Sequence, residues 1–327
     1  MTKGHMHQQT SVDASGIDVS LIIISLNSRA FLRDCIRSIH ASTWRNVRYE
    51  VIAVDNGSSD GTPDMLAEDY PEVRVVANRS NVGYCRAGNQ GAAIARGRHF
   101  VLLNDDTLMI DDAIAALVEW ADEHDAAMIG SRLLNTDGTD QFSSGRRFTT
   151  PFAALFGRKS ILTRLFPGAA PARRYLMSDL VQLREPYEVD WLSAAAMMVR
   201  RDVFEQAGGL AEDFYYFHEQ VFCARVLRAG GRIYLHPASR IIHHEGAGSG
   251  HRTRRVRRRH ITAFHSAALR WYCLHHGLGP LHPLRMIAAA ALWTRAGVLV
   301  AVDAVKPERH ALQATLEASR PEGGVAV

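Results

Sequence analysis

Two observations predict an α/β fold with a mostly parallel central sheet, helices on both faces and a helical C-terminal segment. Apolar runs rich in β-branched residues alternate with runs of helical periodicity through the first third of the chain. The apolar runs have no polar face, which is typical of strands that are covered by helices on both sides. With 327 residues, 47% of them hydrophobic, the chain is long enough for one large domain with appendages.

The expected elements follow in order along the chain. Four strands are predicted over residues 19–25, 49–54, 73–77 and 99–103. Helices are predicted between them, over residues 31–40, 62–69 and 86–96. Further on, residues 232–235 are predicted to form a strand, His236 and Pro237 a turn, and residues 241–246 the end of another strand.

Composition divides the chain into four parts. Residues 1–17 are polar and lack the apolar core of a signal peptide, so we expect a disordered leader there. The α/β domain follows over 18–250, then a basic and amphipathic helical region over 251–310, and a flexible tail over 311–327. The four cysteines lie far apart without a CxxC pair, which favours a reducing cytoplasm.

Each of the first four strands ends in a polar cluster, and the clusters are residues 25–27, 55–57, 78–83 and 104–106. Ligands of open α/β sheets bind at the carboxyl ends of the strands, so we expect one site there. Asp55 and Asn56 can accept from the N–H groups of a base or from ribose hydroxyls, while Gly57 and Gly61 let the backbone turn closely. A purely structural Asx turn is the alternative. The chain has no GxGxxG or Walker sequence, which argues against kinases and ATPases of those types.

Asp105 and Asp106 come at the end of an apolar run. Unpaired carboxylates beside a core repel each other and resist desolvation. A divalent metal that also binds a diphosphate would compensate for both charges. The alternative is that the two residues cap a helix that begins near Asp111.

Several segments carry a family resemblance: IIISLN from Ile22, VDNGSSDGT from Val54, NVGYCRAGN from Asn81, LNDDT from Leu103, and VDWLSAAAMMVRR from Val189, followed by Phe204 and Gly208-Gly209-Leu210. Together, over about residues 19–249, they resemble family 2 glycosyltransferases, and most nearly the rhamnosyltransferase-like branch. The resemblance implies the GT-A fold, with a catalytic domain over 18–250, and inverting transfer from a nucleotide sugar.

The resemblance also implies a role for each matching position. Asp55 would bind the base, and the further donor-binding residues would be Ser25, Asn27, Asn56, Gly57, Asn81, Gly83, Asn89, Asn104 and Asp105. Asp106 would hold Mg²⁺ or Mn²⁺ against the diphosphate, and His243 would return to the metal or the diphosphate. Family members often carry Asn-Pro-Asp or Asn-Asn-Asp at residues 104–106, so the role of the extra carboxylate at Asp105 is open.

Inversion requires a base that removes the proton of the acceptor hydroxyl. Alignment of the family pattern on Cys223, Arg225 and Gly230 places Glu219 at the base position and His218 where a glutamate is usual. Glu219 is one methylene longer than the usual aspartate, so His218 can tune it or share its work. The alternative is an exposed acid at a helix N-terminus.

The C-terminal region begins with six arginines between Arg252 and Arg259. A solvated helix face, a nucleic-acid patch and a surface for anionic lipid or pyrophosphate are the alternatives; nucleic acid is the weakest because no recognised module accompanies the arginines. Residues 281–305 are apolar but interrupted by Arg285, Arg295 and Asp303. We therefore expect an amphipathic helix on the membrane or on the catalytic domain, not a transmembrane span, in a cytoplasmic protein peripheral to the inner face of the membrane.

The expected function is metal-dependent inverting transfer of a sugar, with rhamnose favoured, from a nucleoside-diphosphate donor to a glycan or lipid-linked acceptor in cell-surface polysaccharide synthesis. Trp191 and Tyr215 can stack on an acceptor sugar, although core packing suits Trp191 equally well. Residues 146–183 are expected to form a loop-rich lid or insertion. UDP-galactofuranose, UDP-glucose or GDP-mannose are alternatives to dTDP-rhamnose, and a nucleotide-sugar-binding protein with weak or lost catalysis is the alternative class. A homo-oligomer is compatible with the sequence.

Overall fold

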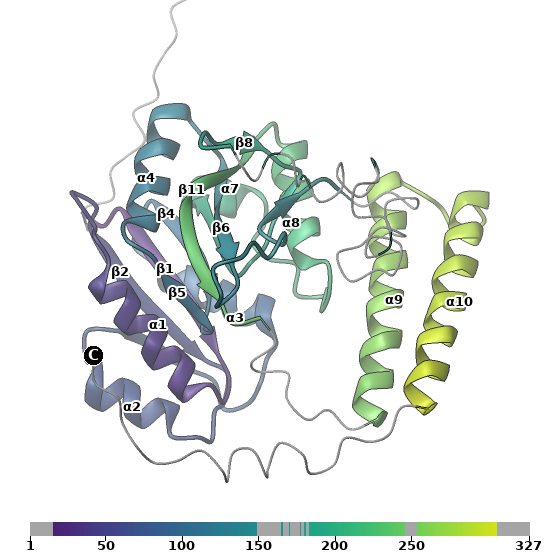
Figure 1. Cartoon of the computed structure of the whole chain (residues 1–327), viewed down its shortest axis with the longest axis horizontal. Coiled ribbons are helices and arrows are strands. Elements are labelled where there is room, and N and C mark those ends of the chain that lie inside the picture. The colour runs from purple at the N-terminus through teal and green to yellow at the C-terminus, as the bar shows by residue number, and fades with distance from the viewer. Residues whose placement is uncertain are drawn as a thin grey trace, which may run out of the picture. The chain divides into compact units, whose positions relative to one another are not determined.

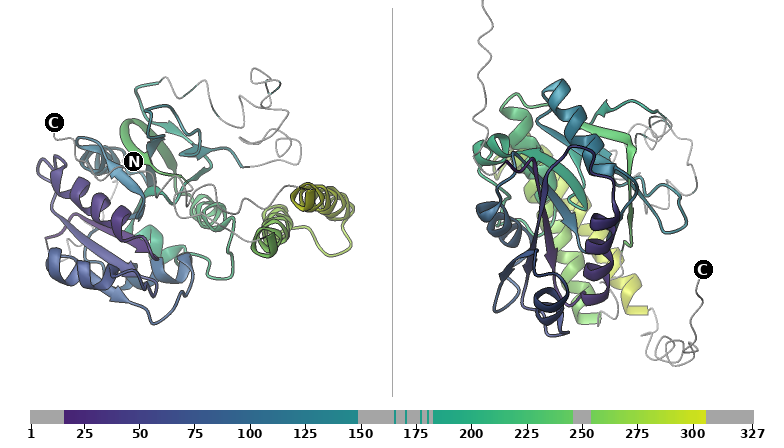
Figure 2. Two further views of the ribbon diagram at one scale, coloured as in Figure 1. Left: turned by 60° about the horizontal axis from the view of Figure 1, so that its bottom comes forward. Right: turned by 90° about the vertical axis from the view of Figure 1, so that its left-hand side faces the viewer.

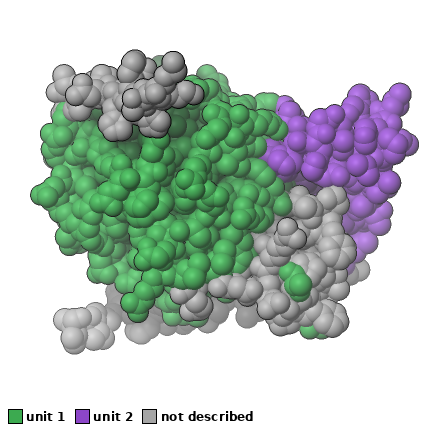
Figure 3. All heavy atoms as spheres, turned by 90° about the horizontal axis from the view of Figure 1, so that it is seen from above, with its two compact units in different colours: residues 1–248 green, residues 249–327 purple. Residues whose placement is uncertain are grey.

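The computed structural model describes residues 16–148, 183–245 and 254–305, together with the single residues 165, 170, 177 and 180. The chain divides into two compact units, residues 1–248 and 249–327, which Figure 3 distinguishes by colour. The predicted tail over 311–327, nearly all of the predicted leader and most of the predicted lid over 146–183 lie outside the described residues.

The first unit is built on one mixed sheet whose strand order is β3-β2-β1-β4-β10-β6-β11-β5, with β8 also paired to β11 (Figure 1). Its described strands are β1 (Val19–Ser25), β2 (Tyr49–Asp55), β3 (Arg74–Ala77), β4 (His99–Asn104), β5 (Thr107–Met109), β6 (Met128–Leu134), β8 (Tyr187–Glu188), β10 (Ala196–Arg200) and β11 (Ile233–His243). The strands β1–β4, β6 and β11 run in one direction, and β5, β8 and β10 run in the other. A separate small ribbon joins β7 (Gly145–Arg146) to β9 (Trp191–Leu192).

Helices cover both faces of this sheet (Figure 2). Successive residues of β1 point to opposite sides, so Leu21 and Ile23 enter one apolar cluster while Ile22 and Ile24 enter the other. The first cluster is closed by α1 (Arg29–Ala41), α2 (Thr62–Asp69) and α4 (Ala113–His124). The second is closed by α3 (Tyr84–Ile94), α7 (Arg201–Gln206) and α8 (His218–Arg228). The predicted α/β architecture is confirmed.

The four predicted N-terminal strands are present with ends that differ by at most one residue. The turn predicted at His236 and Pro237 is wrong, because β11 runs through both residues. Its parallel pairing with β6 breaks register between His236 and Arg240 and then resumes. Proline has no N–H for a ladder bond, so an irregular stretch of a strand is where it can be accommodated.

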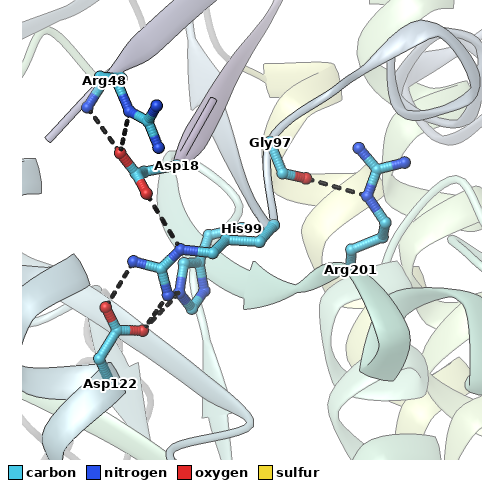
Figure 4. A network of polar contacts seen from close by, with 7 residues as sticks. Asp18, Arg48, Gly97, His99, Asp122 and Arg201 are labelled. Carbon is cyan, nitrogen blue, oxygen red and sulfur yellow. Dashed lines mark hydrogen bonds and ion pairs between the residues drawn. The ribbon is translucent and has the colours of Figure 1, made fainter. Parts of the chain in front are cut away.

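An ionic network lies at the amino ends of β1 and β4 (Figure 4). The carboxylate of Asp18 pairs with Arg48 and Arg98, both at 3.2 Å. Asp122 on α4 pairs with the guanidinium of Arg98 and with His99 Nε2, the latter at 3.0 Å. The network therefore ties a helix to two central strands at the end of the sheet opposite to the predicted ligand site.

The second unit contains α9 (Arg254–His276) and α10 (Pro283–Val305), which pack together. Helices were predicted in this region, and they are confirmed. Arg257 pairs with Asp303 at 2.7 Å, so one of the charges expected to interrupt the apolar surface of α10 is buried against α9. Within the part of the chain that the structure describes, α10 alone is long and apolar enough to cross a membrane, judged by length and composition.

Candidate active site

The first three strand-end clusters are bonded to one another. Because β1 and β2 are adjacent parallel strands, the loops that follow them start side by side. The main-chain N–H of Asn56 donates to the carbonyl oxygen of Ser25 at 2.8 Å, and that of Asn78 donates to the carbonyl oxygen of Asp55 at 2.9 Å. The predicted convergence of these clusters is therefore present in the fold.

The loops after β1 and β2 are joined through Asn27 and Asp55. Asn27 Oδ1 accepts from the main-chain N–H of Ser59 at 2.8 Å, and the N–H of Asn27 donates to Ser58 Oγ at 2.8 Å. Asp55 is 2% exposed, and one of its carboxylate oxygens accepts from the N–H of Ser58 at 3.1 Å. This bond spans three residues, one more than in an Asx turn, but it gives the carboxylate a structural role of the kind named as the alternative.

A close approach joins the second cluster to the third. Gly57 has a φ of +85°, and a Cβ atom at this position would lie 2.7 Å from the Cα of Ser80. Asn56 Oδ1 accepts from the main-chain N–H of Val82 at 3.3 Å, while Asn81 Oδ1 accepts from that of Gly83 at 2.8 Å. Glycine at position 57 thus permits the contact that shapes this edge of the site.

The side chain of Asn89 is hydrogen-bonded within the protein. Its Oδ1 accepts from the N–H of Leu210 at 2.9 Å, and its Nδ2 donates to the carbonyl oxygen of Leu210 and to Glu212 Oε1. Both ends of the amide thus hold α3 to the segment after α7. The side chain was predicted to bind the donor, but its hydrogen-bonding groups are used within the protein.

The acidic cluster after β4 meets the end of β11. The short strand β5 pairs antiparallel with β11, with His243 opposite Thr107. His243 Nε2 lies 3.3 Å from Asp106 Oδ1 and 3.3 Å from Asn104 Nδ2. Since β5 separates the two aspartates from α4, which begins only at Ala113, they do not cap that helix.

The surroundings of the Asp105 and Asp106 carboxylates favour a nearby cation. Asp106 Oδ1 is buried and has no hydrogen-bond partner among the described residues. Burial, together with the charge of Asp106, raises the pKa of the Asp105 carboxyl to about 6, although the hydroxyls of Ser25 and Ser28 act in the opposite direction. Buried carboxylates that lack donors are stabilised by a positive ion.

The number of protein ligands at this position is small. No group of three or more His, Cys, Asp or Glu side chains converges on one point within the described ranges. Mg²⁺ usually binds through one or two carboxylates plus substrate phosphates and water. Asp106 and His243 therefore fit an ion that is shared with a diphosphate, and they do not fit a metal held by the protein alone.

The predicted base and its neighbour occupy the first turn of α8. His218 Nε2 lies 3.6 Å from Glu219 Oε2, and the two side chains are 13% and 21% exposed. The ring of His218 packs against that of Tyr84, with centroids 5.1 Å apart. The pKa of Tyr84 is raised well above its usual range by burial and by the charge of Glu219, with a smaller contribution from Asp105. The charges of Glu219 and Asp105 thus both act on the Tyr84 hydroxyl.

The two acceptor candidates differ in exposure. Trp191 is 7% exposed; its Nε1 donates to the carbonyl oxygen of Arg147 at 3.2 Å, and the guanidinium of Arg146 lies over its ring. Trp191 is therefore a packing residue, and the stacking role predicted for it is not supported. Tyr215 is 67% exposed, with its ring 4.9 Å from that of Tyr216.

One side chain at this site was missed by the sequence analysis. Gln141 is 2% exposed and contacts His243 through both ends of its amide. A single glutamine in a polar loop after β6 forms no recognisable pattern, so nothing in the sequence pointed to it.

Comparison with known proteins gives one family. The sequence model described as Glycosyl transferase family 2 matches residues 20–208. N-acetylglucosaminyl-diphospho-decaprenol L-rhamnosyltransferase of Mycobacterium tuberculosis is 26% identical over 306 residues, which cover 90% of this chain and 96% of that protein. Succinoglycan biosynthesis protein ExoO of Rhizobium meliloti is 28% identical over 261 residues, which cover 79% and 69%.

Two solved structures with bound nucleotide sugars have a similar fold. A mannosyltransferase from Pyrobaculum calidifontis, in complex with GDP-Man and Mn²⁺, superimposes with a TM-score of 0.51 at 19% identity, over 92% of this chain and 79% of the other. S. aureus TarS 1–349 in complex with UDP-GlcNAc gives a TM-score of 0.53 at 15% identity, over 85% and 72%. At these identities the likeness is one of fold.

Proposed function

The chain belongs to glycosyl transferase family 2, and from this membership we propose that it transfers a sugar with inversion, in a reaction that requires Mg²⁺ or Mn²⁺. The observation that carries the proposal is the pair formed by Asp106 and His243. A buried carboxylate oxygen without a hydrogen-bond partner in the described structure faces an imidazole nitrogen at 3.3 Å. The pair lies at the carboxyl end of β4, beside the polar clusters that follow β1 and β2.

The donor nucleotide is proposed to bind along these clusters. Asp55 would accept from the base with the lone pairs that its bond to the N–H of Ser58 leaves, while Asn27 and Asn81 would border the pocket. The remaining proposed donor contacts are Ser25, Asn56, Gly57, Gly83, Asn104 and Asp105. The hydrogen bonds between the loops support this role because they hold the loops in place before the ligand arrives.

Asp106 and His243 would hold the ion. When bound, it would offset the charge of the diphosphate and stabilise the nucleoside diphosphate as it leaves. Carboxylate and phosphate oxygens suit both Mg²⁺ and Mn²⁺, and an imidazole ligand is more typical of transition metals than of Mg²⁺. The two protein ligands leave the other coordination positions to the donor and to water.

Glu219 is proposed as the general base. Its carboxylate would take the proton of the acceptor hydroxyl while that oxygen attacks the anomeric carbon and the bond to the diphosphate breaks, with the electron pair leaving on the phosphate oxygen. His218, 3.6 Å away, would orient the carboxylate. The pair lies in the first turn of α8, where an acidic side chain interacts favourably with the helix dipole.

A rhamnose donor and a lipid-linked acceptor are proposed from the curated relative. The name of the mycobacterial enzyme specifies rhamnosyl transfer to N-acetylglucosaminyl-diphospho-decaprenol, and the alignment spans 96% of that enzyme. We propose a corresponding step in cell-surface polysaccharide synthesis, with Tyr215 as a contact for the acceptor sugar. Donors of the UDP- or GDP-hexose type are the alternative, since fold neighbours were solved with such donors.

Attachment to the inner face of the membrane is proposed through the second unit. Arg255 and Arg258 on α9 supply positive charge, and α10 exposes Met286, Ile287 and Val298. Each basic residue near an anionic bilayer contributes about 1 kcal/mol. Binding to vesicles that contain phosphatidylglycerol at low salt is expected to weaken when both arginines are replaced by glutamine. Equal binding to neutral phosphatidylcholine vesicles would contradict the electrostatic part of this proposal.

One experiment separates a transferase from a binding protein without catalysis. Thermal unfolding is followed with dTDP, UDP and GDP, each with and without Mn²⁺, and release of the best nucleotide from its sugar is then measured. We expect one nucleotide to stabilise the protein only with Mn²⁺ and its sugar donor to be turned over. Stabilisation without any turnover, with acceptor glycolipid present, would favour the binding protein.

A further inference from the structure

Gln141 contacts His243, the proposed metal ligand, at two points. Its side chain is 2% exposed and lies in the segment between β6 and β7. Its Oε1 lies 2.9 Å from Nδ1 of His243, and its Nε2 donates to the main-chain carbonyl oxygen of the same histidine. One amide thus contacts both the ring and the backbone of His243.

These contacts determine where the imidazole proton lies. A carbonyl oxygen can only accept, so the NH₂ group of Gln141 must face the backbone of His243 and Oε1 must face Nδ1. Oε1 is itself an acceptor, so Nδ1 must carry the proton. In a neutral imidazole the other nitrogen is then unprotonated. The lone pair of Nε2 then accepts from Asn104 Nδ2 at 3.3 Å, and Asp106 Oδ1 lies at the same distance from Nε2.

The segment that carries Gln141 is fixed to the sheet. The main-chain N–H of Gln141 donates to the carbonyl oxygen of Leu133 at 3.1 Å. Next to it, Asp140 forms a two-point ion pair with Arg132 on β6, with distances of 2.5 and 2.6 Å. Ser143 Oγ donates to Gln141 Oε1 at 3.2 Å. The amide is consequently positioned by the scaffold and not by the ligand.

Without this acceptor, a competing arrangement becomes available. A proton on Nε2 would occupy the nitrogen that faces Asn104 and Asp106. Nε2 would then have no lone pair for a cation, and of the two proposed ligands only Asp106 would remain. Gln141 prevents it by drawing the proton to the far side of the ring.

We propose that Gln141 is a positioning residue that holds His243 in the Nδ1–H tautomer, so that Nε2 and Asp106 Oδ1 face a divalent cation together. The part concerning the cation rests on the function proposed above. Residues that bond the second nitrogen of a ligating histidine fix its tautomer and orientation, and their loss typically lowers metal affinity about 10- to 100-fold.

The test compares Gln141→Met with Ser143→Ala in the full chain. Methionine keeps the length and apolar stem of the side chain but offers no amide acceptor. The tautomer of His243 is read from its ¹⁵N shifts at about pH 8, where an imidazole is ordinarily neutral, with His243→Gln used for assignment. We expect the Nδ1–H form in the wild type and in Ser143→Ala, and the Nε2–H form in Gln141→Met.

Metal affinity gives the second readout. Free Mn²⁺ is followed by electron paramagnetic resonance in the presence of the nucleoside diphosphate that most stabilises the wild type. We expect about 10- to 100-fold weaker binding by Gln141→Met and near-normal binding by Ser143→Ala. If Gln141→Met does not fold, Gln141→Glu still offers an acceptor to Nδ1 and is expected to retain the Nδ1–H tautomer.

Two outcomes would overturn the proposal: an Nε2–H tautomer in the wild type, or a Gln141→Met protein that keeps both the Nδ1–H form and wild-type affinity. Failure of the proposed function is visible separately. If Asp106→Ala bound Mn²⁺ as tightly as the wild type, the metal site would be wrong, whereas the tautomer measurement would still decide the role of Gln141 toward His243.

Discussion

Glu219 and His218 are adjacent but are expected to differ in what their loss does. Glu219→Gln should lower kcat about 10²- to 10⁴-fold with little change in the KM for the donor, because an amide cannot accept the acceptor proton. His218→Ala should lower kcat less, since it removes only a neighbour at 3.6 Å. The measurement is steady-state transfer by both variants. A larger loss in His218→Ala would transfer the role of base to the histidine.

Single residues were predictable where a strand end fixed them. Asp55 and Asp106 follow continuous apolar runs, so the carboxyl end of the sheet is the place where their side chains must lie. Asn89 lies on a helix, and its sequence context did not reveal that its amide bonds to Leu210. Gln141 lies in a loop, where only tertiary structure brings it to His243.

At the scale of elements, α3 packs on the sheet through a glycine. A Cβ atom at Gly91 would lie 2.4 Å from Ile22 Cγ2 and 3.1 Å from Val54 Cγ2. Gly91→Ala is therefore expected to lower the free energy of unfolding by about 1–3 kcal/mol through overpacking, despite the better helix propensity of alanine. Chemical denaturation of Gly91→Ala and of Ala93→Ser, on the exposed side of the same helix, tests this. An unchanged denaturation midpoint in Gly91→Ala would show that α3 can shift away from the sheet without loss of stability.

The elements that the sequence analysis found are those with strong local patterns. The strands β1–β4 are apolar through most of their length, and the intervening helices have a clear period. The strand β5 has only three residues, and Pro237 suggested a turn where β11 continues. β11 pairs with β6 on both sides of the irregular stretch, so it continues as one strand. Its pairing with β5 then places His243 near Asp106.

At the scale of the whole first unit, the network around Asp122 is expected to make stability sensitive to acid. Burial acts to raise the pKa of the Asp122 carboxyl, but His99 and Arg98 outweigh it and lower the pKa from 3.8 to about 2. A carboxyl whose pKa is depressed by folding stabilises the protein above its unfolded pKa, and this stabilisation is lost as the pH falls from about 4 toward about 2. Urea midpoints across this interval should fall less steeply in Asp122→Asn than in the wild type. Equal slopes for the two proteins would show that the interactions of Asp122 with His99 and Arg98 contribute nothing to the pH dependence of stability.

The proposed metal site joins two distant parts of the first unit, since Asp106 follows β4 and His243 ends β11, far apart in sequence. Its most direct test is transfer by Asp106→Ala, compared with the wild type and Asp105→Asn across a titration of Mn²⁺. A bound metal ion contributes several kcal/mol to the transition state, so Asp106→Ala is expected to lose at least about 10³-fold in kcat, more than Asp105→Asn, at every Mn²⁺ concentration. Near-normal transfer by Asp106→Ala at saturating Mn²⁺ would contradict the assignment of Asp106 as the residue that holds the metal against the diphosphate.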